Sequence, residues 1–234
     1  MIVKNSFIKK YWTALLDVFY PENCQACAGQ LFGNEQVICT SCRVSLPRTN
    51  SHLVEMPSLA LKFEGKVLVQ SVFSFLKFEK GGKVQHLLHA LKYKNKPEVG
   101  VFLGKLYGQE LRQSKFYFDL VVGVPLHARK QAQRGYNQAD ALAKGFAEGL
   151  DTEWSAEVAV RQKFTETQTG KTRAERHENV ANIFRVIQPQ LIQNKHVVVI
   201  DDVVTTGATI ESLLIELLDN GAKSVSVITL AAAI

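Results

Sequence analysis

Two adjacent carboxylates, Asp201 and Asp202, stand between a run of apolar residues and a turn rich in threonine. The apolar run, residues 197–200, is typical of a strand buried on both faces, as in a parallel sheet. Carboxylates accept hydrogen bonds from the vicinal hydroxyl groups of a sugar, or hold a hydrated Mg²⁺. The turn Thr205–Thr209 offers hydroxyl groups, backbone N–H groups and a helix N-terminus, which suit a phosphate. A ribose 5-phosphate satisfies both halves of such a site, and we expect both acids to face it rather than the core.

This segment resembles the phosphoribosyl pyrophosphate (PRPP) motif of type I phosphoribosyltransferases. It shows four apolar residues, two acids, two apolar residues and Thr-Thr-Gly-x-Thr, and it matches the motif at every position. The resemblance implies that Asp201 and Asp202 are the catalytic pair, and that PRPP is bound by the residues after them: Val203, Val204, Thr205, Thr206, Gly207, Ala208 and Thr209. The plainer alternative is a buried strand and a capped turn that bind nothing, but paired acids there have no packing purpose. No Gly-Lys-Ser/Thr follows the turn, which argues against a nucleoside triphosphatase.

A second group of candidate phosphate ligands follows the short apolar strand expected at residues 119–124. A diphosphate needs cations and backbone N–H groups. The stretch just past this strand supplies them in Pro125, Leu126, His127, Arg129, Lys130 and Arg134. A solvated basic loop before a helix is the alternative. Beside a PRPP motif, the stretch becomes the best candidate for the pyrophosphate site.

Residues 161–182 are polar and charged without an apolar period, and we expect a long loop there. Long loops without secondary structure are usually disordered or serve as lids. A lid that closes over PRPP would exclude water from a reactive sugar. The candidate residues of this flexible loop are Lys163, Gln168, Lys171, Arg173 and Arg176.

All four cysteines lie near the N-terminus, in the pairs Cys24-x-x-Cys27 and Cys39-x-x-Cys42. Two such knuckles supply four thiolates in a tetrahedron around Zn²⁺. An iron–sulfur centre and a redox dithiol are the alternatives. The metal would replace the hydrophobic core that so short a segment cannot build. No cysteine lies near the PRPP motif, so a thiol nucleophile is excluded there.

A chain of 234 residues holds one medium α/β domain and a small appendage. The formal net charge of +6 and the isoelectric point near 9.1 fit a polyanionic ligand, a small phosphate or mere solubility. No signal peptide precedes the cysteines and no apolar run could span a bilayer. We therefore expect a reducing, cytoplasmic compartment.

Strands that alternate with helices predict an open parallel α/β sheet. We expect strands at residues 71–78, 119–124, 156–160, 184–187, 196–200 and 224–230, and helices at 83–91, 98–112, 136–150 and 210–220, the last ended by Gly221. Residues 6–20 read as an amphipathic helix that docks on its own domain or contacts a membrane peripherally. We expect two domains, residues 1–50 with the cysteine module and residues 51–234, of which 51–80 are linker and hood strands.

The order of these motifs resembles the ComF (ComFC/GntX) family. Pro-Leu-His, Arg-Gly-Tyr-Asn-Gln, the run Gln168…Arg176…Asn179 and the Asp-Asp/Thr-Thr-Gly motif follow a four-cysteine module, from about Cys24 to Leu230. Lys171 departs from the pattern, which usually has an apolar residue there. The resemblance implies a type I phosphoribosyltransferase (PRTase-like) fold, a structural Zn²⁺ and Mg²⁺ with PRPP. It also implies a cytoplasmic role in DNA uptake during natural transformation (competence), or in DNA utilisation.

Two classes of function remain open. An enzyme would transfer the ribosyl group of PRPP to an acceptor, with Mg²⁺ and the basic loop stabilising the departing pyrophosphate. Nucleobase salvage is one form of this, and no residue identifies the acceptor. A non-catalytic module would sense PRPP or a nucleotide and bind single-stranded DNA together with the uptake machinery. The lysine-rich, aromatic stretch 77–96 suits a single strand, although a solvated basic face explains it more simply. A scaffold with a vestigial site is a third reading.

Overall fold

The structure is a computed structural model that describes residues 22–162 and 183–233. The chain divides into two compact units, residues 1–46 and residues 47–234. The expected helix at 6–20 lies outside the described residues, and so do the loop candidates Lys163, Gln168, Lys171, Arg173 and Arg176. Among the described residues, no helix is both long enough and apolar enough to cross a membrane.

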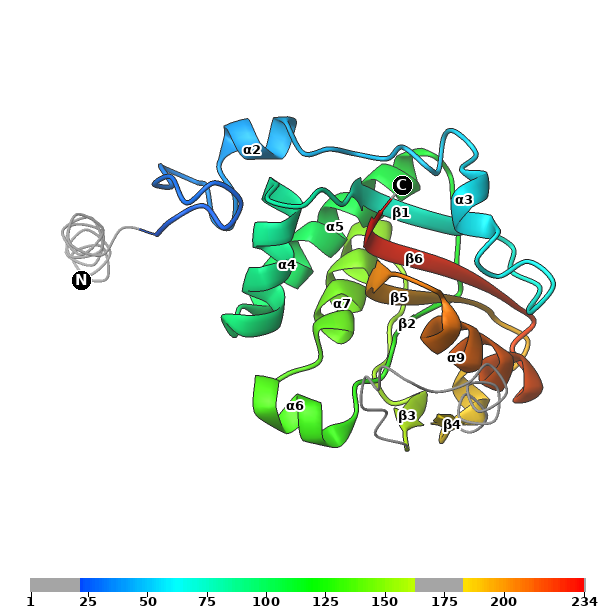
Figure 1. The fold of residues 1–234 in the computed structure, drawn as a ribbon. Helices are drawn as coiled ribbons and strands as arrows, with labels where there is room; N and C mark the ends of the chain where they lie inside the picture. Colours follow the sequence, from blue (N-terminus) through cyan, green and yellow to red (C-terminus); the bar gives the residue numbers. More distant parts are fainter. Residues whose placement is uncertain (1–21, 163–182, 234) are drawn as a thin grey trace, which may run out of the picture. The chain divides into compact units, whose positions relative to one another are not determined.

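A four-stranded parallel sheet forms the centre of the larger unit (Figure 1). The strand order is β1-β6-β5-β2, and every neighbouring pair is parallel. The strands are β1 (Val72–Lys77), β2 (Leu120–Gly123), β5 (His196–Val204) and β6 (Ser224–Ala232). Their apolar residues are buried on both faces, which explains the nearly continuous apolar runs. The prediction of an open parallel sheet is confirmed.

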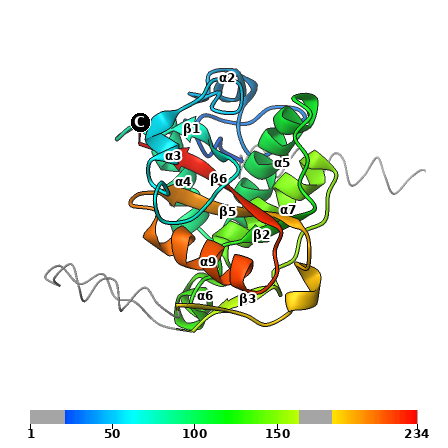
Figure 2. The ribbon, with the colours of Figure 1, turned by 90° about the vertical axis from the view of Figure 1, so that its right-hand side faces the viewer.

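Helices cover both faces of this sheet (Figures 1 and 2). One face is covered by α9 (Ala208–Asp219), which forms a buried cluster with β5 and β6. The opposite face is covered by α5 (Pro97–Gln113) and α7 (Gln138–Leu150), whose apolar residues gather around Ile200 and Ile228. The helix α4 (Lys83–Tyr93) packs beside α5. Each strand residue therefore contacts one of two helical layers according to its side of the pleat.

Glycines let α5 and α7 pack with their backbones in contact. A Cβ atom on Gly104 would lie 2.2 Å from the carbonyl oxygen of Leu142, and one on Gly145 would lie 2.0 Å from that of Val101. Only hydrogen fits at these positions. The sequence indicates this close packing by glycines spaced four residues apart, at Gly100, Gly104 and Gly108 and at Gly145 and Gly149. We did not predict this contact, because a glycine in a helix more often indicates a weak helix.

Smaller elements complete the larger unit and differ in places from the expected ones. The strands β3 (Ala159–Arg161) and β4 (Phe184–Val186) form a separate antiparallel pair, and η1 (Pro189–Leu191) is a turn of 3₁₀ helix. Residues 48–70, expected to form a linker that partly pairs in strands, hold α3 (Pro57–Ala60) and turns, with one isolated bridge at residue 48. The predicted left-handed Gly221 is confirmed, with φ of 100°.

Candidate functional site

The two adjacent acids lie within β5 rather than after it. The backbone of residues 201–204 continues to pair with β6, so that Asp201 lies opposite Thr229 and Val204 lies opposite Ala232. The expected end of this strand at residue 200 was therefore wrong, because charged residues were taken to stop a strand that β6 in fact extends. Successive side chains of a strand point to opposite faces of the sheet. Asp201 and Asp202 thus belong to different faces.

Asp202 is buried on the face that carries α4. Its side chain is 8% exposed, and the ammonium of Lys92 lies 3.1 Å from its Oδ2 atom. The expectation that both acids turn away from the core is wrong for Asp202. The cost of burying this carboxylate is offset by a cation from a helix more than a hundred residues earlier in the sequence.

Asp201 is half-buried on the other face, near Arg161 of β3. Burial and the charge of Asp202 raise the pKa of Asp201 to about 7, against the opposing effects of the backbone N–H of Asp202 and the cations Lys92 and Arg161. The N–H of Asp202 donates to the Oδ1 atom of Asp201 over 2.8 Å. Near neutral pH this carboxyl is therefore poised between its two protonation states. A cation or a hydroxyl donor bound beside it would favour the ionised form.

The threonine turn leads from β5 into the N-terminus of α9. Gly207 adopts a φ of 82°, a conformation that glycine adopts without strain, and a Cβ there would lie 3.3 Å from the ring of Phe63. Thr205 and Thr206 are exposed, and the ammonium of Lys62 donates to the carbonyl oxygen of Thr205 over 2.7 Å. Exposed hydroxyl groups, the end of a twelve-residue helix and a nearby cation together suit a phosphate.

The candidate pyrophosphate residues lie between β2 and α7. After Pro125 and Leu126, the chain forms the short helix α6 (Ala128–Arg134), where we expected a loop. His127 caps this helix, because its Nδ1 atom accepts from the N–H of Arg129 over 3.2 Å. Asn137 then caps α7 and donates to the carbonyl oxygen of Val124, which ties the loop back to the strand. The basic side chains are thus presented by a helix.

Residues of α4 and of the segment just after it join this region, and no pattern in the sequence places them here. A cavity of about 300 Å³ is lined by Lys92, Tyr93, Asn95, Lys130, Gln133 and Arg134. We predicted two of these cations, Lys130 and Arg134, from their place after β2. The first three belong to a stretch that reads only as basic and aromatic. No motif marks them, and only the packing of α4 brings them to the site.

A further acid, the half-buried Asp140, lies at the start of α7 against β2. Its Oδ1 atom would be 2.4 Å from a Cβ on Gly123, so the glycine leaves room for the carboxyl group. Burial raises the pKa of Asp140 to about 7, against a hydrogen bond from Asn137 that lowers it. Two acids at this edge of the sheet, Asp140 and Asp201, thus titrate near neutral pH.

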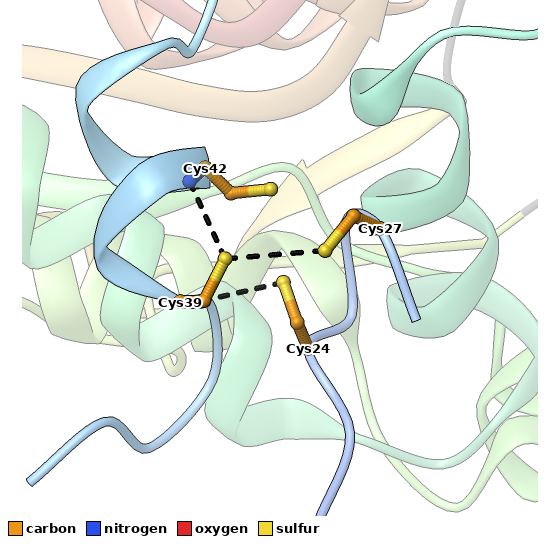
Figure 3. A group of neighbouring side chains, drawn as sticks. All are labelled: Cys24, Cys27, Cys39 and Cys42. Atoms are coloured by element: carbon orange, nitrogen blue, oxygen red, sulfur yellow. Dashed lines mark hydrogen bonds between the residues drawn. The ribbon is translucent and has the colours of Figure 1, made fainter. Parts of the chain in front are cut away.

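The four cysteines of the smaller unit converge on one point (Figure 3). Their sulfur atoms all lie within 4.8 Å of one another, and those of Cys27 and Cys39 are 3.9 Å apart. Four thiolates at the zinc–sulfur distance form a tetrahedron with edges of about 3.8 Å. Cys39 also caps α2 (Thr40–Val44), and its N–H donates to the sulfur of Cys24. The geometry fits a metal ion.

The thiol groups of this cluster differ in acidity. Burial opposes the ionisation of Cys24, but backbone N–H groups of Cys39, Cys27 and Ala26 donate to its sulfur and lower its pKa to about 7. Burial and the neighbouring thiols raise the pKa of Cys42. One thiolate is therefore available near neutral pH before a metal binds, and a bound cation would favour ionisation of the others.

Comparison with known proteins identifies the larger unit as a phosphoribosyl transferase domain. That family, described as "Phosphoribosyl transferase domain", matches residues 93–234, and the chain belongs to it. The chain is also 31% identical over 209 residues to DNA utilization protein YhgH of Escherichia coli K12, covering 87% of each chain. It is 30% identical over 133 residues to Competence protein F of Haemophilus influenzae, covering 54% of this chain and 58% of that protein. Among proteins with a phosphoribosyl transferase domain, the chain is a member of the ComF family, as the order of its motifs predicted.

Solved structures of phosphoribosyltransferases resemble the chain more distantly. Glutamine PRPP amidotransferase from B. subtilis is 22% identical, with a TM-score of 0.41, and the match covers 60% of this chain and 30% of that one. Adenine phosphoribosyltransferase from Leishmania tarentolae is 14% identical, with a TM-score of 0.39 and coverage of 64% and 74%. The chain thus spans less than a third of the amidotransferase.

Proposed function

We propose that the chain binds PRPP at the carboxyl edge of its sheet. The observation that carries this proposal is the joint placement of Asp201 and Asp202 in β5 and of the Gly207 turn at the N-terminus of α9. Asp201 and Asp202 would approach the ribose from the two faces of the sheet edge and accept hydrogen bonds from its hydroxyl groups, and residues 205–209 would bind the 5-phosphate through their N–H groups and hydroxyl groups. Membership of the phosphoribosyl transferase domain family supports this assignment.

The diphosphate would lie on the side of α6. Residues 125–127 offer backbone groups at the end of β2, and Arg129 and Arg134 offer cations. The carboxylates of the site fit Mg²⁺ through its hydration shell, and a bound Mg²⁺ would neutralise part of the diphosphate charge. Arg161 is a further cation near Asp201, on the face of the sheet opposite to Asp202. The flexible-loop candidates at residues 163–176 would complete the site, as proposed from the sequence.

We also propose that this site serves the use of DNA or its uptake in the cytoplasm. The names of the relatives, DNA utilization protein and Competence protein F, support this role. The cysteine cluster would hold a structural Zn²⁺, since four thiolates at these distances suit that ion. We treat residues 1–50 as the zinc module and residues 51–234 as the PRPP-binding domain, with residues 51–80 as linker and hood. Single-stranded DNA, the uptake machinery and a peripheral membrane contact are the proposed partners.

The choice between an enzyme and a sensor depends on turnover. Calorimetry with PRPP and Mg²⁺ tests the binding site, and a screen of nucleobases for pyrophosphate release tests transfer. Release that requires one nucleobase would identify a transferase and its acceptor. Binding without release, together with salt-dependent binding of single-stranded DNA, would favour the sensor. If PRPP neither binds nor raises the unfolding temperature, the proposed site is wrong.

A further inference from the structure

The end of α4 is fastened to the segment between α6 and α7 by three contacts. The hydroxyl of Tyr136 donates to the carbonyl oxygen of Leu91. The guanidinium of Arg134 lies over the ring of Tyr93, 5.8 Å from its centroid. Gly135, with a φ of 82°, approaches Asn95 so closely that a Cβ would lie 3.3 Å from the Asn95 side-chain oxygen. The Arg-Gly-Tyr sequence therefore fixes the last turn of α4 against α6.

This junction surrounds a basic cavity. Its volume is about 300 Å³, and the charged residues in its lining are Lys92, Lys130 and Arg134, with no carboxylate among the lining residues. The remaining lining residues, Tyr93, Asn95 and Gln133, offer an aromatic ring and two amides. A lining with three cationic residues and neutral donors matches a small ligand with several negative charges. A monophosphate needs fewer cations than this cavity presents.

Lys92 connects this cavity to the sugar site. Its ammonium lies 3.1 Å from the buried carboxylate of Asp202, and the residue also lines the cavity. A lysine side chain has a long flexible stem and three donors, so one ammonium can contact Asp202 and an anion at the same time. The residue stands just before the part of the chain that matches the phosphoribosyl transferase domain, which begins at residue 93.

We propose that this cavity takes the diphosphate group of PRPP and that Lys92 is a ligand shared between that diphosphate and Asp202. The inference rests on the proposed PRPP site and extends it to a residue of α4. Lys92 then has two effects. It offsets the buried charge of Asp202 when no ligand is bound, and it aligns the diphosphate with the sugar when PRPP is bound.

The test measures the affinity for inorganic pyrophosphate with Mg²⁺ by calorimetry, and then for PRPP, in the full-length protein. Lys92→Met should weaken pyrophosphate binding about ten-fold or more, which corresponds to the loss of one charge-assisted hydrogen bond. Lys92→Arg should retain most of the affinity. Lys130→Met removes a cavity cation that is not the ion-pair partner of Asp202, and it should also weaken pyrophosphate binding several-fold. Lys105→Met is the control, because that lysine forms an exposed pair with Glu148 on another surface.

The outcomes separate this inference from the proposed function. If the wild-type protein binds PRPP and both methionine variants at residues 92 and 130 bind pyrophosphate as tightly as it does, the inference is wrong and the PRPP site stands. If the wild-type protein binds neither ligand, both fall. If these variants lose only the binding of a thymidine oligonucleotide, the cavity serves a nucleic-acid backbone, and the assignment to diphosphate is overturned.

Discussion

The two aspartates of β5 should have opposite effects on the stability of the unliganded protein. Burial and the charge of Asp202 raise the pKa of Asp201 to about 7, from an ordinary value of 3.8. A carboxyl whose pKa is raised on folding contributes stability that is complete below about pH 4 and is lost as the pH rises to about 7. Asp201→Asn removes that loss. The variant should therefore gain stability relative to the wild type as the pH is raised.

The magnitude follows from the size of this change. The difference between 3.8 and about 7 corresponds to roughly 4 kcal/mol if the whole effect is realised. About three fifths of it falls between pH 5 and pH 8. Asp201 keeps part of its surface exposed, so solvent screening reduces the effect. We expect Asp201→Asn to gain about 1–2 kcal/mol relative to the wild type between pH 5 and pH 8.

Asp202→Asn should behave differently. It leaves the ammonium of Lys92 beside a neutral amide, and breaking a fully buried pair costs about 3–5 kcal/mol. The side chain of Lys92 is 26% exposed and can turn toward solvent, which reduces the loss to about 1–2 kcal/mol. The loss of its charge also lowers the pKa of Asp201, which partly offsets this cost. Both variants should nevertheless bind PRPP at least ten-fold more weakly, because each removes a charged acceptor for the ribose.

Urea-induced unfolding at pH 5 and pH 8 measures both effects, with calorimetry for PRPP. Glu64→Gln removes an exposed carboxylate and serves as the control for the pH difference. An Asp201→Asn protein that gains no stability over the wild type between these pH values would show that the acid is solvated and that its burial has been misjudged. An Asp202→Asn protein as stable as the wild type would refute the ion pair with Lys92.

Two further predictions concern the scaffold and the metal. Gly104→Ala should lower the free energy of unfolding, measured in urea, by about 2 kcal/mol. A methyl group 2.2 Å from the Leu142 carbonyl oxygen forces α5 and α7 apart, and this cost exceeds the gain in helix propensity. Lys105→Ala on the exposed face is the control, and a glycine variant that is more stable than the wild type would contradict the packing. Metal analysis should find one zinc per chain, with at least a ten-fold loss of zinc affinity in Cys39→Ser; undiminished zinc in that variant would exclude the four-thiolate site.

Local patterns in the sequence predicted the chemistry of the site. The run from Val197 to Thr209 identified a buried strand and paired acids, and predicted a phosphate-binding turn, without reference to the rest of the chain. The spacing of the four cysteines likewise predicted their convergence, because ligands with two residues between them on a tight turn lie close together. Such signals depend on neighbours in the sequence, and these are the same in every fold that the chain could adopt.

Contacts between distant segments could not be predicted from the sequence. The pairing of residues 201–204 with β6 put Asp201 and Asp202 on opposite faces, because a strand extended by its neighbour keeps its twofold alternation. The helix α4 supplied Lys92 to a carboxylate over a hundred residues away. Charge and polarity alone could not predict such a pair, since any lysine of the chain can neutralise an acid. The sequence determined which groups could bind a phosphorylated sugar, and the tertiary structure decided which acid is buried and which cation accompanies it, because packing alone sets the distances between separate elements.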